Sequence, residues 1–203
     1  LNKEIRFFNA GSSECFGNTN KSLANENSPF SPRSPYATAK STAFWQVANY
    51  REAYNLYSCT GILGNHESPL RPKRFVTQKI ISGVKNIKNG VKKELILGNL
   101  NTWRDWGWAP EYVEAIYLML QNDIPEDFLI ATGKTNSLEY FVDLAFQKAS
   151  LDKNKYVKID SIYFRPTDIE FSYLDPSKIK RKLGWQAKMK LKDIVSIMYE
   201  KYN

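Results

Sequence analysis

The spacing of hydrophobic positions alternates between two patterns along the chain. Short apolar runs at residues 4–10, 56–63, 95–97 and 128–131 predict buried strands. Longer segments repeat apolar residues every three or four positions and predict helices that begin near residues 35, 75, 110, 136, 176 and 191. Strands and helices in alternation, joined by short links, predict an α/β fold with a parallel sheet and right-handed crossovers.

Apolar stripes predict which faces of two helices are buried. The stripe of the helix that begins at Pro35 consists of Ala39, Ala43, Val47 and then Tyr50 or Tyr54. The stripe of the helix that begins at Pro110 consists of Val113, Ile116, Tyr117 and Leu120. A third helix, ending at Ala149, is expected to be capped by Asn136 with Glu139.

Candidate chemistry lies just after the predicted strands. Residues 11–14 and 64–69 follow two of them, and ligands of parallel sheets gather outside the carboxyl ends of strands. Between these loops, Ser34 and Pro35 predict a helix start that places Tyr36 and Lys40 on one face, with Cβ atoms about 5–6 Å apart. This pair alone is a weak signal, because a packed Tyr beneath a solvated Lys has the same spacing.

Composition limits the class of protein. The 203 residues are 42% hydrophobic and 14% aromatic, which fits a globular chain with a substantial core. An apolar run long enough for a membrane span is absent from the sequence, and no secretory leader pattern opens it. The two cysteines, Cys15 and Cys59, lack disulfide or zinc spacing, so we expect reduced thiols, no metal site and a cytoplasmic protein.

The net charge of +8 raises the question of nucleic-acid binding. Many lysines are dispersed through the second half of the chain, as on solvated helix faces, rather than gathered in one stripe with aromatic residues. We therefore expect no nucleic-acid partner. A small phosphate-bearing substrate is a simpler use for a few arginines.

The glycines lack one expected arrangement. None of the ten belongs to a G-x-G-x-x-G motif, the turn that holds a dinucleotide in a complete Rossmann sheet. The chain also opens at Leu1, almost directly in a predicted strand. We therefore expect it to be the later part of a longer protein, and by itself to bind a dinucleotide weakly or not at all.

Several motifs occur together and in order along almost the whole chain. They are SSE at residues 12–14, PRSPYATAK at 32–40, GILGNHESP at 61–69, FVTQKI at 75–80, LGNLNTWRDWGWAPEYVEA at 97–115 and YFRPTDIE at 163–170. The set resembles the GDP-mannose 4,6-dehydratase family of the extended short-chain dehydrogenase/reductase superfamily. The resemblance implies the later part of a Rossmann-like, doubly wound parallel sheet, interleaved with a smaller substrate-binding domain. Residues 1–65 would belong to the NADP-binding domain and residues 66–203 mainly to the nucleotide-sugar-binding domain, with segments that return to the Rossmann-like sheet.

The resemblance also implies a reaction in three steps. NADP takes hydride from carbon 4 of GDP-mannose, water leaves across carbons 5 and 6, and hydride returns to carbon 6. The implied catalytic residues are Ser12, Glu14, Tyr36 and Lys40. Tyr36 would be the base for the carbon-4 hydroxyl, supported by the positive charge of Lys40 and by a hydrogen bond from Ser12. Glu14 would handle the elimination of water.

Other residues acquire expected binding roles from the same resemblance. NADP would contact Tyr36, Lys40, His66 and Arg71. The nucleotide-sugar would contact Asn65, Lys79, Arg104, Arg165 and Asp168. The full-length protein is expected to be a homodimer or homotetramer. The chain departs from the family at Leu70-Arg71-Pro72-Lys73, where relatives commonly have Arg-Arg-Gly-Glu, and at Trp108, where they have His.

Two alternatives to this function remain open from sequence. One is an epimerase, or a dehydratase that acts on another nucleotide-sugar, although Glu14 and the NHESP motif argue against it. The other is a non-catalytic remnant that binds a nucleotide-sugar or a partner subunit, which the missing glycine motif favours for the isolated chain.

Overall fold

The computed structural model describes residues 5–19, 22–164 and 166–202. Its strands are β1 (Phe7–Ala10), β2 (Ser58–Leu63), β3 (Asn65–Glu67), β4 (Leu95–Leu97), β5 (Trp103–Trp108), β6 (Phe128–Ile130), β7 (Thr135–Ser137) and β8 (Val157–Ile159). Its α-helices are α1 (Pro35–Tyr54), α2 (Val76–Lys88), α3 (Ala109–Gln121), α4 (Leu138–Ala149), α5 (Lys153–Tyr156), α6 (Ser177–Leu183) and α7 (Leu191–Glu200). Two 3₁₀ turns, η1 (Ser13–Phe16) and η2 (Ser161–Tyr163), complete the elements.

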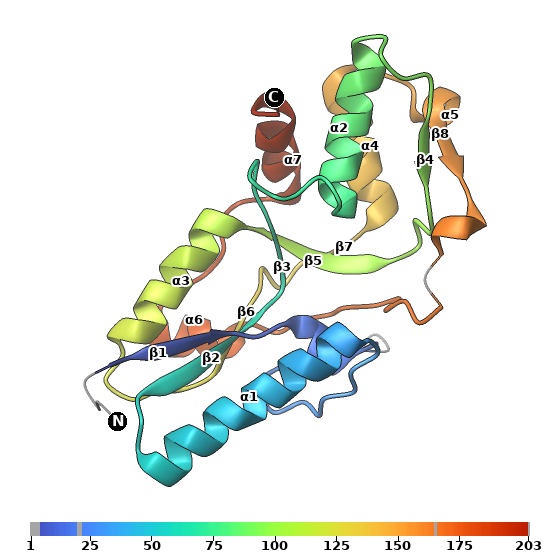
Figure 1. Ribbon diagram of the computed structural model, residues 1–203. Helices are drawn as coiled ribbons and strands as arrows, with labels where there is room; N and C mark the ends of the chain where they lie inside the picture. The colour runs from blue at the N-terminus through green and yellow to red at the C-terminus, as the bar shows by residue number, and fades with distance from the viewer. Residues whose placement is uncertain (1–4, 20–21, 165, 203) are drawn as a thin grey trace.

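A parallel sheet with the strand order β1-β2-β6 forms one half of the molecule. Successive residues of a strand point to opposite faces, and the core follows this period of two. Ile62 and Leu129 pack on one face with Phe44 of α1, whereas Cys59 and Phe128 pack on the other face with residues of α3 and α6. Helices thus cover both faces of the sheet, as Figure 1 shows. The α/β class with a parallel sheet is confirmed.

The other half of the molecule is a helical group formed by α2, α4 and α7, which pack against one another beside the strand pair β4–β8. Its core includes Ile81, Phe141 and Met198, each completely buried. Strand β5 joins the two halves, because it pairs in parallel with β3 and antiparallel with β7. The segment Asn65–Glu67, expected as a loop, is therefore a short strand, and β5 was not anticipated at all.

The helix starts follow local capping chemistry. Ser34 accepts a hydrogen bond from the backbone N–H of Ala37 at 3.0 Å, and Pro35 occupies the first turn of α1, as predicted. The expected cap of α4 is wrong by one residue. The hydroxyl of Ser137, rather than the side chain of Asn136, accepts from the N–H of Tyr140 at 3.1 Å.

The buried faces of α1 and α3 differ from the predicted stripes. Helix α1 buries Ala37, Phe44 and Ala48, while Tyr50 and Tyr54 stay exposed. Helix α3 buries a different row from the predicted one, formed by Tyr112, Ala115 and Met119. Both helices carry apolar residues on more than one side, so the period alone does not decide which side meets the sheet.

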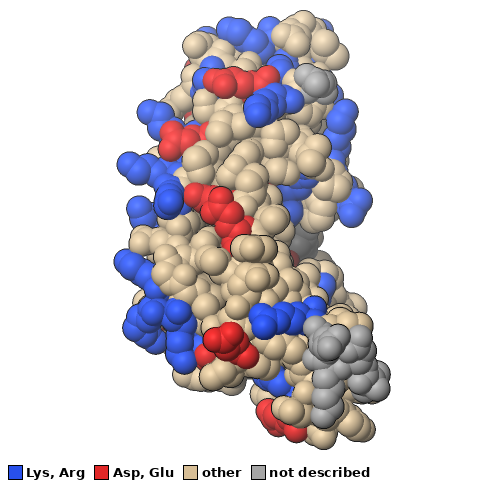
Figure 2. Space-filling view, turned by 90° about the vertical axis from the view of Figure 1, so that its left-hand side faces the viewer, with Lys and Arg blue, Asp and Glu red and all other residues tan. Residues whose placement is uncertain are grey.

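Basic residues are spread along the face of the molecule that Figure 2 shows, with acidic residues among them. Some of these charges are paired across elements, as Lys178 and Lys182 are with Glu126, at 3.2 and 3.0 Å. Within the described ranges, the helices are too short or too polar to span a bilayer.

Candidate active site

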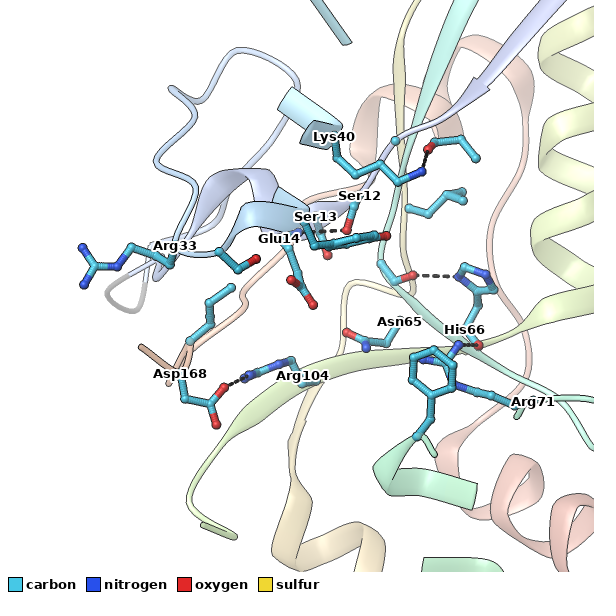
Figure 3. Close-up of a pocket in the computed structure, with 18 of the residues that line it drawn as sticks. Ser12, Ser13, Glu14, Arg33, Lys40, Asn65, His66, Arg71, Arg104 and Asp168 are labelled. Atoms are coloured by element: carbon cyan, nitrogen blue, oxygen red, sulfur yellow. Dashed lines mark hydrogen bonds and ion pairs between the residues drawn. The ribbon is translucent and has the colours of Figure 1, made fainter. Parts of the chain in front are cut away.

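A cavity of about 690 Å³ opens at the carboxyl ends of β1 and β2, where a parallel sheet is expected to bind its ligand. Its wall combines the loop after β1, the start of α1, the residues from the end of β2 into β3, the segment before α2, β5 and residues 167–169. Of the expected site residues, the cavity is lined by Tyr36 and by eight that Figure 3 labels: Ser12, Glu14, Lys40, Asn65, His66, Arg71, Arg104 and Asp168.

The loop after β1 positions Glu14 through a short 3₁₀ turn. Ser12 is the N-cap of η1, and its hydroxyl accepts from the N–H of Glu14 at 3.3 Å. The turn ends at Gly17, whose φ is +67° and where a Cβ would lie 2.2 Å from the carbonyl oxygen of Ser31, so only glycine fits. In Figure 3 the carboxylate of Glu14 points into the space between Ser12 and Arg104.

Tyr36 and Lys40 lie one helical turn apart in α1, as their spacing predicts. The Lys40 ammonium donates to the carbonyl oxygen of Ala10 at 2.8 Å and lies 5.8 Å from the centroid of the Tyr36 ring. An ammonium has three donors, and the bond to Ala10 uses one. The Tyr36 side chain is 53% exposed, so its phenol is accessible from the cavity.

His66 on β3 is oriented by its own backbone. Its Nδ1 lies 3.0 Å from the carbonyl oxygen of Gly64, which can only accept, so Nδ1 carries the proton. Burial lowers the pKa of His66, the bond to Gly64 raises it, and the nearby Arg71 guanidinium lowers it further. With the net direction downward, the imidazole is neutral at pH 7, and Nε2 is left as an acceptor.

Behind the cavity wall lies a carboxylate that sequence reasoning missed. Glu67, the last residue of β3, is completely buried and accepts from the Thr77 hydroxyl at 2.7 Å. Its Oε2 lies 3.0 Å from Nε of Arg71. Burial raises the pKa of Glu67 to about 7, against the lowering effects of Arg71 and Thr77. The sequence contains a signal for this residue, because Glu67 lies in the NHESP motif, whose neighbouring residues were expected to bind a ligand.

A second buried carboxylate, Asp105, stands next to Arg104 in β5. It accepts from the backbone N–H groups of Thr132 and Lys134 at 2.9 and 3.1 Å, and burial raises its pKa to about 6. These bonds fix the turn between β6 and β7 against β5. Asp105 also escaped the sequence analysis, although it belongs to the RDWG motif.

Arg104 and Asp168, both expected to contact a nucleotide-sugar, contact each other in this structure. Nη2 of Arg104 lies 3.1 Å from Oδ1 of Asp168, and Nη1 donates to the carbonyl oxygen of Trp103 at 3.0 Å. The two side chains come from β5 and from a segment more than sixty residues later, as Figure 3 shows. This end of the cavity therefore contains the guanidinium of Arg104, which donates hydrogen bonds, and the carboxylate of Asp168, which accepts them.

Lys79 and Arg165 are the remaining expected site residues. Lys79 is absent from the lining of this cavity and borders a separate hollow of about 370 Å³, with its ammonium 4.4 Å from the centroid of the Tyr163 ring. Arg165 lies outside the described residues. Conversely, Arg33, Arg74 and Phe75 line the main cavity without having been anticipated.

Comparison with known proteins places this geometry in a family. The model of the GDP-mannose 4,6 dehydratase family matches residues 1–198. GDP-mannose 4,6 dehydratase 1 of Arabidopsis thaliana is 46% identical over 198 residues, which cover 98% of this chain and 55% of the plant protein. The Dictyostelium discoideum protein of that name is 44% identical over 218 residues, which cover 99% of this chain and 61% of that protein. The chain therefore spans little more than half the length of these curated relatives.

Solved structures show the same fold at low sequence identity. RMD from Pseudomonas aeruginosa, complexed with NADPH, superposes with a TM-score of 0.86 at 16% identity, covering 96% of this chain and 65% of that protein. dTDP-glucose 4,6-dehydratase from Bacillus anthracis, in complex with NAD, superposes with a TM-score of 0.85 at 18% identity, covering 97% of this chain and 61% of that one.

The fold is thus that of the Rossmann-type dehydratases and epimerases of nucleotide-sugars. Within that class, the chain belongs to the GDP-mannose 4,6-dehydratase family.

Proposed function

We propose that the protein converts GDP-mannose to GDP-4-keto-6-deoxymannose with the help of NADP, and that this chain supplies the catalytic side chains. The observation that carries the proposal is that one cavity is lined by all four expected catalytic residues, Ser12, Glu14, Tyr36 and Lys40. Membership of the family supports the same reaction. An epimerase has no need of a carboxylate beside the Tyr–Lys pair, so Glu14 favours a dehydratase.

The donor groups of the cavity fit a dinucleotide. When bound, NADP would accept hydride from carbon 4 of the sugar and return it to carbon 6. The remaining donors of Lys40 suit ribose hydroxyls, and Nε2 of His66 can accept from the same cofactor. Arg71 and Arg74 line the wall together, and guanidinium groups suit phosphate oxygens, so the wall could hold a phosphate of the dinucleotide, including the additional phosphate by which NADP differs from NAD.

Tyr36 would take the proton of the carbon-4 hydroxyl. A base is required because the hydroxyl loses its proton as carbon 4 becomes a ketone. The Lys40 ammonium, 5.8 Å from the centre of the ring, favours negative charge on the phenol oxygen. The hydroxyl of Ser12, in the loop after β1, would hydrogen-bond the sugar oxygen and hold it toward Tyr36.

Glu14 would carry the elimination. Once carbon 4 is a ketone, the proton on carbon 5 is acidic enough for a carboxylate to remove it. The electron pair left on carbon 5 forms the double bond to carbon 6, and the hydroxyl on carbon 6 departs. It leaves as water with a proton delivered by the carboxylic acid that Glu14 has become.

The nucleotide half of the substrate would lie toward Arg104 and Asp168. We assign the pyrophosphate to Arg104 and Arg165, a carboxylate contact with the ribose to Asp168, and a contact with the sugar to Asn65, and we leave out Lys79 because it borders the separate hollow. Residues 1–65 would serve mainly NADP and residues 66–203 mainly the nucleotide-sugar. We further propose a homodimer or homotetramer, and a cytoplasmic protein, in keeping with the free thiols of Cys15 and Cys59.

The test uses the complete polypeptide that the gene encodes, and incubates it with GDP-mannose and NADP. Mass spectrometry should detect a sugar nucleotide that has lost one water, and Tyr36→Phe should abolish it while leaving GDP-mannose binding nearly intact. An isomer of GDP-mannose as the product would favour the epimerase instead. Near-wild-type turnover by Tyr36→Phe would remove Tyr36 from its role as the base.

A further inference from the structure

Arg71 is held in the cavity wall by contacts on several sides. Its guanidinium carbon lies 4.0 Å from the centroid of the Phe75 ring, and Nη1 donates to the carbonyl oxygen of His66 at 3.2 Å. On the edge away from the cavity, Nε lies 3.0 Å from Oε2 of Glu67. The side chain is 18% exposed, so the guanidinium is fixed yet still reaches the cavity that it lines.

Burying the carboxylate of Glu67 costs free energy, because its charge is removed from water. Its side chain is 1% exposed, and Arg71 is the basic group with which it forms an ion pair. Among the described residues, Oε1 of Glu67 and Nε of Arg71 both lack a well-directed hydrogen bond, so the pair is held by charge rather than by a linear bond. Such a pair adds little to stability, because the cost of removing two charges from water offsets their attraction.

What the pair does provide is orientation. Arg71 belongs to the segment between β3 and α2, where a long side chain would otherwise sample many rotamers. The carboxylate draws Nε to the rear of the wall while Phe75 supports the flat face, and the N–H groups of Nη1 and Nη2 that Glu67 and the His66 carbonyl do not use form the edge that a ligand in the cavity can reach. Five N–H donors in a rigid fork allow one edge to be held and another to bind.

We propose that Glu67 is a positioning residue, which holds the Arg71 guanidinium so that its free edge receives a phosphate group of the ligand in the cavity. The identity of that ligand as a phosphorylated dinucleotide rests on the proposed function. The positioning itself does not rest on it.

A purely structural role for Glu67 is the rival explanation. Its bond to Thr77, in the first turn of α2, could serve only to secure the helix start. The two roles differ in their dependence on Arg71. Positioning predicts that Glu67 matters to the ligand only when Arg71 is present, whereas a structural role predicts the same effect with and without Arg71.

The first experiment needs no ligand. The Nε–Hε signal of Arg71 is followed by NMR in the 203-residue chain and assigned by its loss in Arg71→Lys, among eight arginines. We expect a shifted signal with slow solvent exchange that moves to the exposed-arginine region in Glu67→Gln. Glu126→Gln, which breaks a remote pair with Lys178 and Lys182, is the matched control. An Arg71 signal unchanged in Glu67→Gln would overturn the proposal.

The second experiment titrates NADPH into the polypeptide that the gene encodes, with the same substitutions. Glu67→Gln should weaken binding roughly tenfold, and should have no further effect in an Arg71→Ala background. Equal weakening in both backgrounds, or none in either, would overturn the proposal. If the wild-type polypeptide that the gene encodes binds no NADPH, the cofactor assignment fails, and the NMR signal alone decides whether Glu67 positions Arg71.

Discussion

The two walls of the cavity hold their functional groups in different ways. The first wall, residues 10–14 and 34–40, positions Glu14, Tyr36 and Lys40 through backbone contacts. The second wall, residues 65–75 with β5, presents Arg71 and Arg104, and a buried carboxylate stands behind or beside each of them. The proposed reactive groups are therefore held by local turns and caps, whereas Arg71 is held by a carboxylate buried between elements and Arg104 by an ion pair with Asp168.

The largest expected effect belongs to the first wall. Glu14→Gln keeps the size of the side chain but removes the base, so elimination should slow by about 10²–10⁴-fold while oxidation at carbon 4 continues. The gene-encoded polypeptide should then accumulate reduced nicotinamide with a 4-keto hexose that has not lost water. Absorbance of the reduced cofactor in a single turnover measures this. A normal yield of 6-deoxy product at the normal rate would refute the role of Glu14.

The second wall should respond in affinity rather than in chemistry. Arg104→Ala removes a charged donor to the pyrophosphate, and we expect GDP-mannose binding to weaken by about 1.5–3 kcal/mol, with Arg165→Ala of similar size. Calorimetry measures the dissociation constants, and Arg181→Ala, on α6, is the control. Unchanged affinity in both variants would remove the pyrophosphate role and leave Arg104 with its contacts inside the protein, such as the ion pair with Asp168.

This contrast also explains how much could be predicted from the sequence. The stretch SPYATAK specifies the helical part of the first wall, residues 34–40, because the cap at Ser34, Pro35 in the first turn and the spacing of Tyr36 and Lys40 all act within one helix. The parallel sheet was likewise accessible, since its strands are short apolar runs between helical segments.

The second wall could not be predicted in the same way. Strand β5, with the sequence WRDWGW, contains Arg, Asp and Gly and lacks the alternation of a half-buried strand. Its place is decided by pairing with β3 and β7, and those pairings bury Glu67 and Asp105. Whether a charged side chain is buried depends on elements far apart in the chain, so no local sequence pattern predicts the burial of Glu67 or Asp105.

The buried carboxylates predict an unusual dependence of stability on pH. The pKa values of Glu67 and Asp105 are raised to about 7 and about 6, so the folded state binds these protons more tightly than the unfolded state does. The free energy of unfolding should therefore fall as pH rises from about 4 to about 7, by at most ~1.4 kcal/mol per pH unit for each group.

Urea unfolding at a series of pH values tests this, with Glu67→Gln and Asp105→Asn each expected to remove part of the slope. Glu126 is an informative control, because Lys182 and Lys178 lower its pKa and its contribution is lost as pH falls instead. If both variants kept the pH slope of the wild-type protein, groups other than Glu67 and Asp105 would dominate the titration.

The smallest expected effect returns to the first wall and its dependence on local structure. Ser34→Ala removes the hydroxyl that accepts from the N–H of Ala37, so the free energy of unfolding should fall by about 1 kcal/mol. Ser137→Ala makes the matched change at the start of α4, away from the cavity, and should cost a similar amount. Only Ser34→Ala should also lower turnover, because Tyr36 and Lys40 lie in the first two turns of the helix that it caps. Equal stability losses with equal turnover in the two variants would mean that packing of Ala37 and Phe44, rather than the cap, fixes the first wall.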